Sequence, residues 1–164
     1  MNQSFISLNF LPKGKFRVDL VEGVTKTNFF SICYGALTTI GLLTFISYAT
    51  TYVLMENLSY QRNQIGTIVG DLQVVAEIAL LIIFLPVGLI ADKIGRRQVY
   101  SFGMFAMGLS YFLYPLATGI GELTMYRIVF AIGMGAATGM LGTVTADYPQ
   151  NHTRGKMIAV TGIL

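Results

Sequence analysis

The sequence predicts an all-α protein, a polytopic bundle of transmembrane helices. Of its 164 residues, 54% are hydrophobic and only 12% are charged, and the mean hydropathy is +0.63. This balance is too apolar for an ordinary soluble domain. Four apolar runs approach or exceed the roughly 20 residues that cross a hydrocarbon core about 30 Å thick. The runs are continuous, whereas the strands of a membrane β-barrel would alternate over segments of about ten residues.

The predicted spans follow one another with short connections. They cover residues 29–55, 66–91, 99–118 and 123–146, and a fifth apolar run begins at residue 157 and reaches residue 164. Residues 1–28 form a polar tail without an early apolar run, unlike a cleavable signal peptide. Because the connections leave no room for a globular domain, residues 29–164 are expected to form one truncated bundle whose fifth helix is incomplete.

Basic residues gather on alternate sides of these spans. Four lie in the N-terminal tail, three follow the second span and two follow the fourth, against one after the first span and none after the third. The positive-inside rule therefore predicts a multi-pass protein of a plasma or inner membrane, with a cytoplasmic N-terminus and the lipid bilayer as a partner. The bases form no clustered face, so we expect no nucleic-acid partner.

Three ionisable side chains fall inside predicted spans, where each costs a few kcal/mol unless it is partnered or hydrated. They are Asp71 and Glu77 in the second span and Arg127 in the fourth. Helical spacing places Gln73 and Glu77 on one stripe, with Glu77 near the midplane and a candidate for proton coupling. Asp71 and Arg127 have similar depths, so they can pair, either as a static salt bridge or as a moving part of proton coupling.

Two other groups of residues suggest a cavity wall and helix contacts. Tyr34, Thr38 and Gln73 are candidates for hydrogen bonds to a substrate, although the Tyr and Thr hydroxyls can equally bond backbone carbonyls. Small residues in the fourth span would let another helix approach closely. The candidate packing glycines are Gly133, Gly135, Gly139 and Gly142.

The connection after the second span carries the pattern Gly88-x-x-x-Asp92-x-x-Gly95-Arg96-Arg97. The glycines permit close packing and a tight reversal, whereas the dipole at the end of the second helix disfavours the charge of Asp92. Bases alone would anchor a cytoplasmic loop, so the acid and the glycines indicate a further role. The pattern and its position resemble the signature loop between helices two and three of the major facilitator superfamily.

Two more elements resemble that family. Arg127 followed by Gly133 and Gly135 is similar to its helix-four arginine motif, although Ala131 stands where glycine is common. The connection after the fourth span is similar to the acid-proline-arginine-glycine element between helices four and five. The matching residues are Asp147, Pro149, Arg154 and Gly155. Three elements in the right order make a specific match over about residues 30 to 164.

The resemblance implies a transporter of twelve helices in two halves, of which this chain supplies four and the beginning of a fifth. It implies a secondary active transporter that moves a small solute by alternating access, with Asp92 and Arg96 gating against the second half of the same protein. On this interpretation Arg127, with Asp71 or Glu77, couples transport to protons. Two other classes compete with it: a non-transporting membrane assembly subunit and a membrane-embedded enzyme. The sequence shows no constellation of catalytic residues, no cofactor motif and no metal-ligand spacing.

Overall fold

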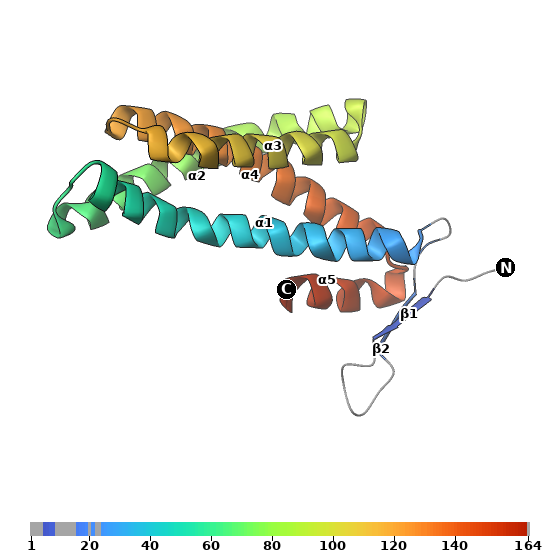
Figure 1. The fold of residues 1–164 in the computed structure, drawn as a ribbon. Helices are drawn as coiled ribbons and strands as arrows, with labels where there is room; N and C mark the ends of the chain where they lie inside the picture. The colour runs from blue at the N-terminus through green and yellow to red at the C-terminus, as the bar shows by residue number, and fades with distance from the viewer. Residues whose placement is uncertain (1–4, 9–15, 20, 22–23, 164) are drawn as a thin grey trace. The chain divides into compact units, whose positions relative to one another are not determined.

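The computed structural model describes residues 5–8, 16–19, 21 and 24–163 and is dominated by helices (Figure 1). The elements are α1 (Lys26–Tyr52) with a π-helical turn η1 (Val53–Asn57), α2 (Arg62–Ile94), α3 (Arg96–Leu113) with a 3-10 turn η2 (Tyr114–Leu116), α4 (Ile120–Asp147), a 3-10 turn η3 (Asn151–Thr153) and α5 (Arg154–Ile163). Four of these, α1 to α4, are long and apolar enough to cross a membrane. The predicted transmembrane helical bundle is confirmed.

The structure adds a short hairpin in the N-terminal segment that the sequence did not predict. Strands β1 (Phe5–Leu8) and β2 (Phe16–Asp19) pair antiparallel, with Phe5 opposite Asp19. A two-stranded hairpin is marginal alone and needs packing against another element. That support comes from η3 and α5, beside which β2 lies.

The chain divides into two compact units. One comprises residues 1–40 and 141–164, and the other comprises residues 41–140. The boundary that the sequence predicted at residue 28 stays a prediction. Each unit is held by its own core, because apolar side chains of neighbouring helices meet inside it.

The core of unit 41–140 runs between the helices that carry the intramembrane charges. Its most buried members include Leu54, Leu123 and Met107, none of which exposes any surface. Tyr114 and Phe130 belong to the same cluster. A second cluster joins the end of α2 to the start of α3 and the middle of α4 through Val87, Val99 and Ala136 and their neighbours.

Unit 1–40 with 141–164 has a smaller core. Phe29 and Ile32 of α1 pack with Met157 of α5, and Leu141 and Tyr148 lie against them. The backbone N–H of Val21 donates to the carbonyl of Tyr148 at 3.0 Å, which ties the segment before α1 to the connection between α4 and α5.

Many large apolar side chains remain exposed, and α2 carries more of them than any other described helix. The most exposed there are Leu81, Ile82, Leu85 and Leu89. A soluble monomer rarely shows a continuous apolar surface of this kind, whereas a helix in lipid does. The exposed face of α2 therefore fits a helix within a bilayer.

Candidate functional site

The site is built around Arg127, which lies two turns into α4 and is only 4% exposed. Its Nη2 donates to Oε1 of Gln73 on α2 at 2.5 Å, and its Cζ lies 5.8 Å from the centre of the Phe130 ring. The cation contributes a favourable contact with the face of that ring. Its Nε and Nη1 are buried without a hydrogen-bond partner among the described residues. A buried guanidinium therefore keeps two of its three nitrogens unused.

Gln73 links this arginine to an acid. Its Nε2 donates to Oε1 of Glu77 at 2.7 Å, one helical turn further along α2. The amide accepts from Arg127 with its oxygen and donates to Glu77 with its nitrogen, which is the only arrangement that satisfies both bonds. Arg127, Gln73 and Glu77 thus form one polar chain, hereafter the relay, across the α2–α4 interface. Arg127, at one end of the relay, is buried, whereas Gln73 and Glu77 are exposed.

The Asp71–Arg127 pair proposed from the sequence is not formed among the described residues, and this is a correction. Arg127 bonds Gln73 instead. Residues 71 and 73 point about 160° apart on a helix with 3.6 residues per turn, so an arginine that reaches one cannot reach the other. Asp71 is exposed and lines a pocket to which Arg127 does not contribute.

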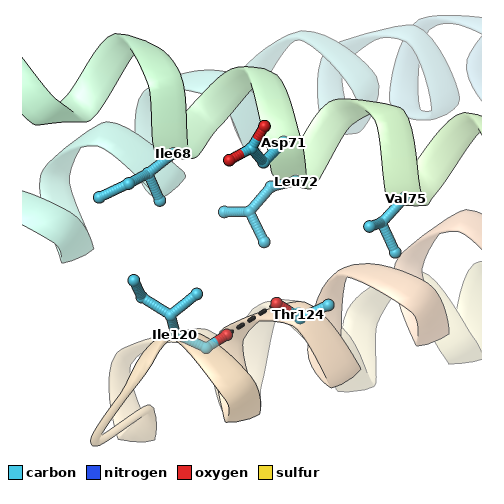
Figure 2. A pocket seen from close by; sticks show the side chains of 6 residues that line it. All are labelled: Ile68, Asp71, Leu72, Val75, Ile120 and Thr124. Carbon is cyan, nitrogen blue, oxygen red and sulfur yellow. Dashed lines mark hydrogen bonds between the residues drawn. The ribbon is translucent and has the colours of Figure 1, made fainter.

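Asp71 lines a small pocket of about 100 Å³ between α2 and α4 (Figure 2). Figure 2 shows the apolar side chains of α2 pointing toward α4 below, while the hydroxyl of Thr124 donates to the carbonyl of Ile120 at 2.8 Å. The lining residues are Ile68, Asp71, Leu72, Val75, Ile120 and Thr124. A second, wholly apolar pocket of about 340 Å³ follows along the same two helices, lined by Val75, Ile78, Ala79, Ile82, Ile83, Ile128 and Ile132.

A polar aromatic cluster lies close to Arg127 on the side of α3. The Tyr111 hydroxyl donates to the carbonyl of Leu42 on α1, and its ring meets Phe130 edge-on at 5.6 Å. Tyr111 and Arg127 thus lie against the same aromatic ring, that of Phe130. The Tyr114 hydroxyl is buried without a hydrogen-bond partner in the described part of the chain. Neither tyrosine was singled out from the sequence.

The signature loop reverses the chain in a single residue. α2 ends at Ile94, α3 begins at Arg96, and Gly95 between them has φ +99° and ψ 140°. Its N–H donates to the carbonyl of Ala91 at 2.9 Å, which closes the last turn of α2. Asp92 lies in that last turn, exposed, and makes no ion pair with the described residues. Gly88 and Arg97 face open space, since a methyl group on Gly88 would meet no atom within 4 Å and the Arg97 side chain is exposed.

Gly95→Ala is expected to destabilise the fold by about 1–3 kcal/mol, because an L side chain rarely adopts this φ. Thermal unfolding in detergent micelles, followed by the circular dichroism of the helices, measures the change. The matched control is Gly108→Ala in α3, which also has open space around it but ordinary helical geometry, and which should be neutral or stabilising. Equal midpoints for both variants would contradict backbone strain at residue 95.

The predicted packing glycines of α4 divide between two neighbours. A Cβ on Gly133 would lie 2.7 Å from the carbonyl oxygen of Gly103 on α3, and one on Gly135 would lie 3.0 Å from side chains of Ile83 and Leu80 on α2. Gly139 would make only ordinary contacts at 3.8 Å, and Gly142 would meet nothing within 4 Å. Gly103 is a contact glycine that was not predicted from the sequence.

The remaining candidates lie in the other unit. Asp147 ends α4, Pro149 is buried, and Arg154 and Gly155 begin α5 after η3. In α1 the Thr38 hydroxyl donates to the carbonyl of Tyr34 at 2.8 Å, so its proton is used by the backbone. The Tyr34 side chain is exposed. Among the described residues, no three His, Cys, Asp or Glu side chains gather closely enough to hold a metal ion.

Comparison with known proteins agrees with this architecture. The model of the Major Facilitator Superfamily matches residues 32–163. The magnetosome protein MamH of Paramagnetospirillum magneticum is 27% identical over 116 residues, which cover 66% of this chain and 26% of that protein. The inner membrane metabolite transport protein YgcS of Escherichia coli is 26% identical over 167 residues, covering 100% of this chain and 34% of that protein.

The riboflavin transporter RibZ of Clostridioides difficile is 35% identical over 77 residues, or 46% of this chain and 16% of that protein. The chain therefore spans at most 34% of the length of these three relatives. No solved structure matches the chain significantly. The family match extends over more than half of the sequence and includes all three motifs, and the chain belongs to the Major Facilitator Superfamily.

Proposed function

We propose that this chain forms part of a secondary active transporter that moves a small solute across a membrane by alternating access and couples the movement to protons. The relatives YgcS and RibZ, whose names state metabolite and riboflavin transport, support a small-solute transporter. In such proteins the binding site lies near the bilayer midplane between two halves that rock about it. Glu77 lies near the middle of α2, and Arg127 lies two turns into α4.

The observation that carries proton coupling is the hydrogen-bonded path from buried Arg127 through Gln73 to Glu77. An acid within a membrane helix is expensive and is retained where a charge has to change during function. The amide of Gln73 hydrogen-bonds both groups, so a change in the protonation state of Glu77 alters the charge one amide away from the arginine. Glu77 is the proposed proton carrier, and Asp71 is a second candidate.

The membrane orientation and the gate belong to the same proposal. The charge asymmetry of the connections favours a cytoplasmic N-terminus, which puts the reversal at Gly95 on the cytoplasmic side. Asp92 is exposed there, beside the helix end that disfavours its charge. We propose that Asp92 and Arg96 form a gate that engages the second half of the transporter.

The test uses the protein expressed from its complete reading frame and reconstituted into vesicles loaded with a pH-sensitive dye. A panel of anionic, neutral and cationic solutes is added, and solute-driven proton movement is recorded. Glu77→Gln is expected to reduce this movement at least tenfold, because the amide cannot carry a proton at neutral pH. The control Glu56→Gln removes an exposed acid of η1 and should leave it unchanged. Unaltered proton movement in Glu77→Gln would eliminate the proposed carrier.

A further inference from the structure

We propose that Arg127 is an anion-binding group and that the solute carried with protons is a small monoanion, such as a carboxylate or dihydrogen phosphate. The inference deepens the proposed function and rests on it for the transport step. Binding itself follows from the surroundings of the guanidinium and is testable separately.

Within the described helices, no neighbouring acid balances the charge of Arg127. α1, α3 and α5 contain no acidic residue, and the acids of α4 lie near its two ends, at Glu122 and Asp147. Among the described residues Asp71 of α2 makes no ion pair, and Glu77 reaches the arginine only through the neutral amide of Gln73. A guanidinium that is 4% exposed thus has no carboxylate in direct contact within the described helices. A buried charge is retained only where something compensates it.

Several hydrogen-bond donors near this charge are unused in the described part of the chain. Nε and Nη1 of Arg127 are buried without acceptors, and so is the hydroxyl of Tyr114, which is 1% exposed and belongs to the same core cluster as Phe130. Tyr111, three residues before Tyr114, packs edge-on against the Phe130 ring, beside which Arg127 also lies. Leaving such donors unpaired is unfavourable. Water would satisfy these hydrogen bonds but not the charge, whereas an oxyanion satisfies both.

The relay links the anion to the proton. A carboxylate on Glu77, one amide away from the guanidinium, repels an incoming anion. Proton uptake by Glu77 removes that repulsion, so anion binding and protonation favour each other by linkage. The charged and titratable groups around this centre are Arg127 on α4, Glu77 on α2, and Tyr111 and Tyr114 on the side of α3. Asp71 of α2 points about 160° away from Gln73 and lines the small pocket. One positive charge matches one negative charge, which favours a monoanion.

The binding test measures thermal stabilisation of the purified protein, expressed from its complete reading frame, in micelles at constant ionic strength. The probes are sodium phosphate and sodium benzoate, with glucose and choline chloride as neutral and cationic comparisons. A ligand of the folded state raises the unfolding midpoint in proportion to its occupancy. Phosphate or benzoate is expected to raise the midpoint, and glucose and choline are expected to leave it unchanged.

Two variants locate the effect. Arg127→Met is expected to abolish the stabilisation by anions, and Tyr114→Phe is expected to raise the half-saturating anion concentration about fivefold, as for one lost hydrogen bond. The control Arg62→Gln removes an exposed charge and should respond as the unaltered protein does. If Arg127→Met does not fold, the half-saturating anion concentration of Tyr114→Phe decides whether the anion site is present.

The outcomes separate this inference from the proposed function. Equal stabilisation by anions in the unaltered protein, Arg127→Met and Tyr114→Phe would overturn it, and so would stabilisation by glucose or choline alone. Proton movement driven only by a neutral solute would leave the transporter intact and overturn the anion site. Anion stabilisation that depends on Arg127, without any proton movement, would support the site and reject proton coupling.

Discussion

Gly133→Ala is expected to lower the stability of the fold by about 1–3 kcal/mol, the range for adding atoms to a filled interface. Its new methyl group would lie 2.7 Å from the carbonyl oxygen of Gly103 and 2.8 Å from the amide nitrogen of Met107. Both are backbone atoms of α3, so no side chain can rotate away. α3 and α4 would have to separate, and the reciprocal contact at Gly103 would open with them.

The measurement is thermal unfolding in micelles, followed by the circular dichroism of the helices. The matched control is Gly142→Ala in the same helix, where a methyl group meets nothing within 4 Å. That variant should be neutral or slightly more stable, because alanine favours helix over glycine by up to about 1 kcal/mol. If Gly133→Ala matched Gly142→Ala, the close crossing of α3 and α4 would be refuted.

The helices were predictable because long apolar runs leave few alternatives. The observed helices begin at residues 26, 62, 96, 120 and 154, against predicted spans from 29, 66, 99, 123 and 157, so each begins three or four residues earlier. The difference arises because the apolar run marks only the part that lies in hydrocarbon, while the hydrogen-bonded helix continues into the polar flanks. The family match confirms the predicted superfamily, and a family of transporters supports the prediction that the chain is no enzyme.

The N-terminal hairpin escaped prediction for the opposite reason. Each strand has only four residues, and alternation over so few positions is a weak signal. Its support is tertiary, from η3 and α5, which follow more than 130 residues later. Local sequence carries no information about that contact.

The sequence singled out several residues of the site, but it did not predict which of them contact one another. Helical spacing placed Gln73 and Glu77 on one stripe, and they are hydrogen-bonded. Depth alone suggested Asp71 as the partner of Arg127, but depth says nothing about which face of α4 the arginine uses. Gly103 and Tyr114 were missed because a glycine or tyrosine in an apolar span has many ordinary roles, and only the crossing of the helices distinguishes them.

Arg127→Met is expected to stabilise the fold by about 1–4 kcal/mol and to abolish coupled transport. Replacing buried charges by apolar side chains of similar size is often stabilising in this range. Methionine removes a buried charge and two nitrogens, Nε and Nη1, that are unpaired among the described residues. The one acceptor left behind, Oε1 of Gln73, belongs to an exposed residue and can bond water.

Unfolding of the Arg127→Met variant is measured without added anion, alongside Arg62→Met, an exposed site where the change should stay within about 0.5 kcal/mol. A loss of about 3–5 kcal/mol would instead identify Arg127 as a structural anchor, because breaking a well-compensated buried charge pair costs that much. The two roles thus predict opposite signs. A more stable protein that no longer moves protons would mean that the arginine is retained for its function although it lowers stability. This result is expected of a group whose counter-charge arrives with the solute.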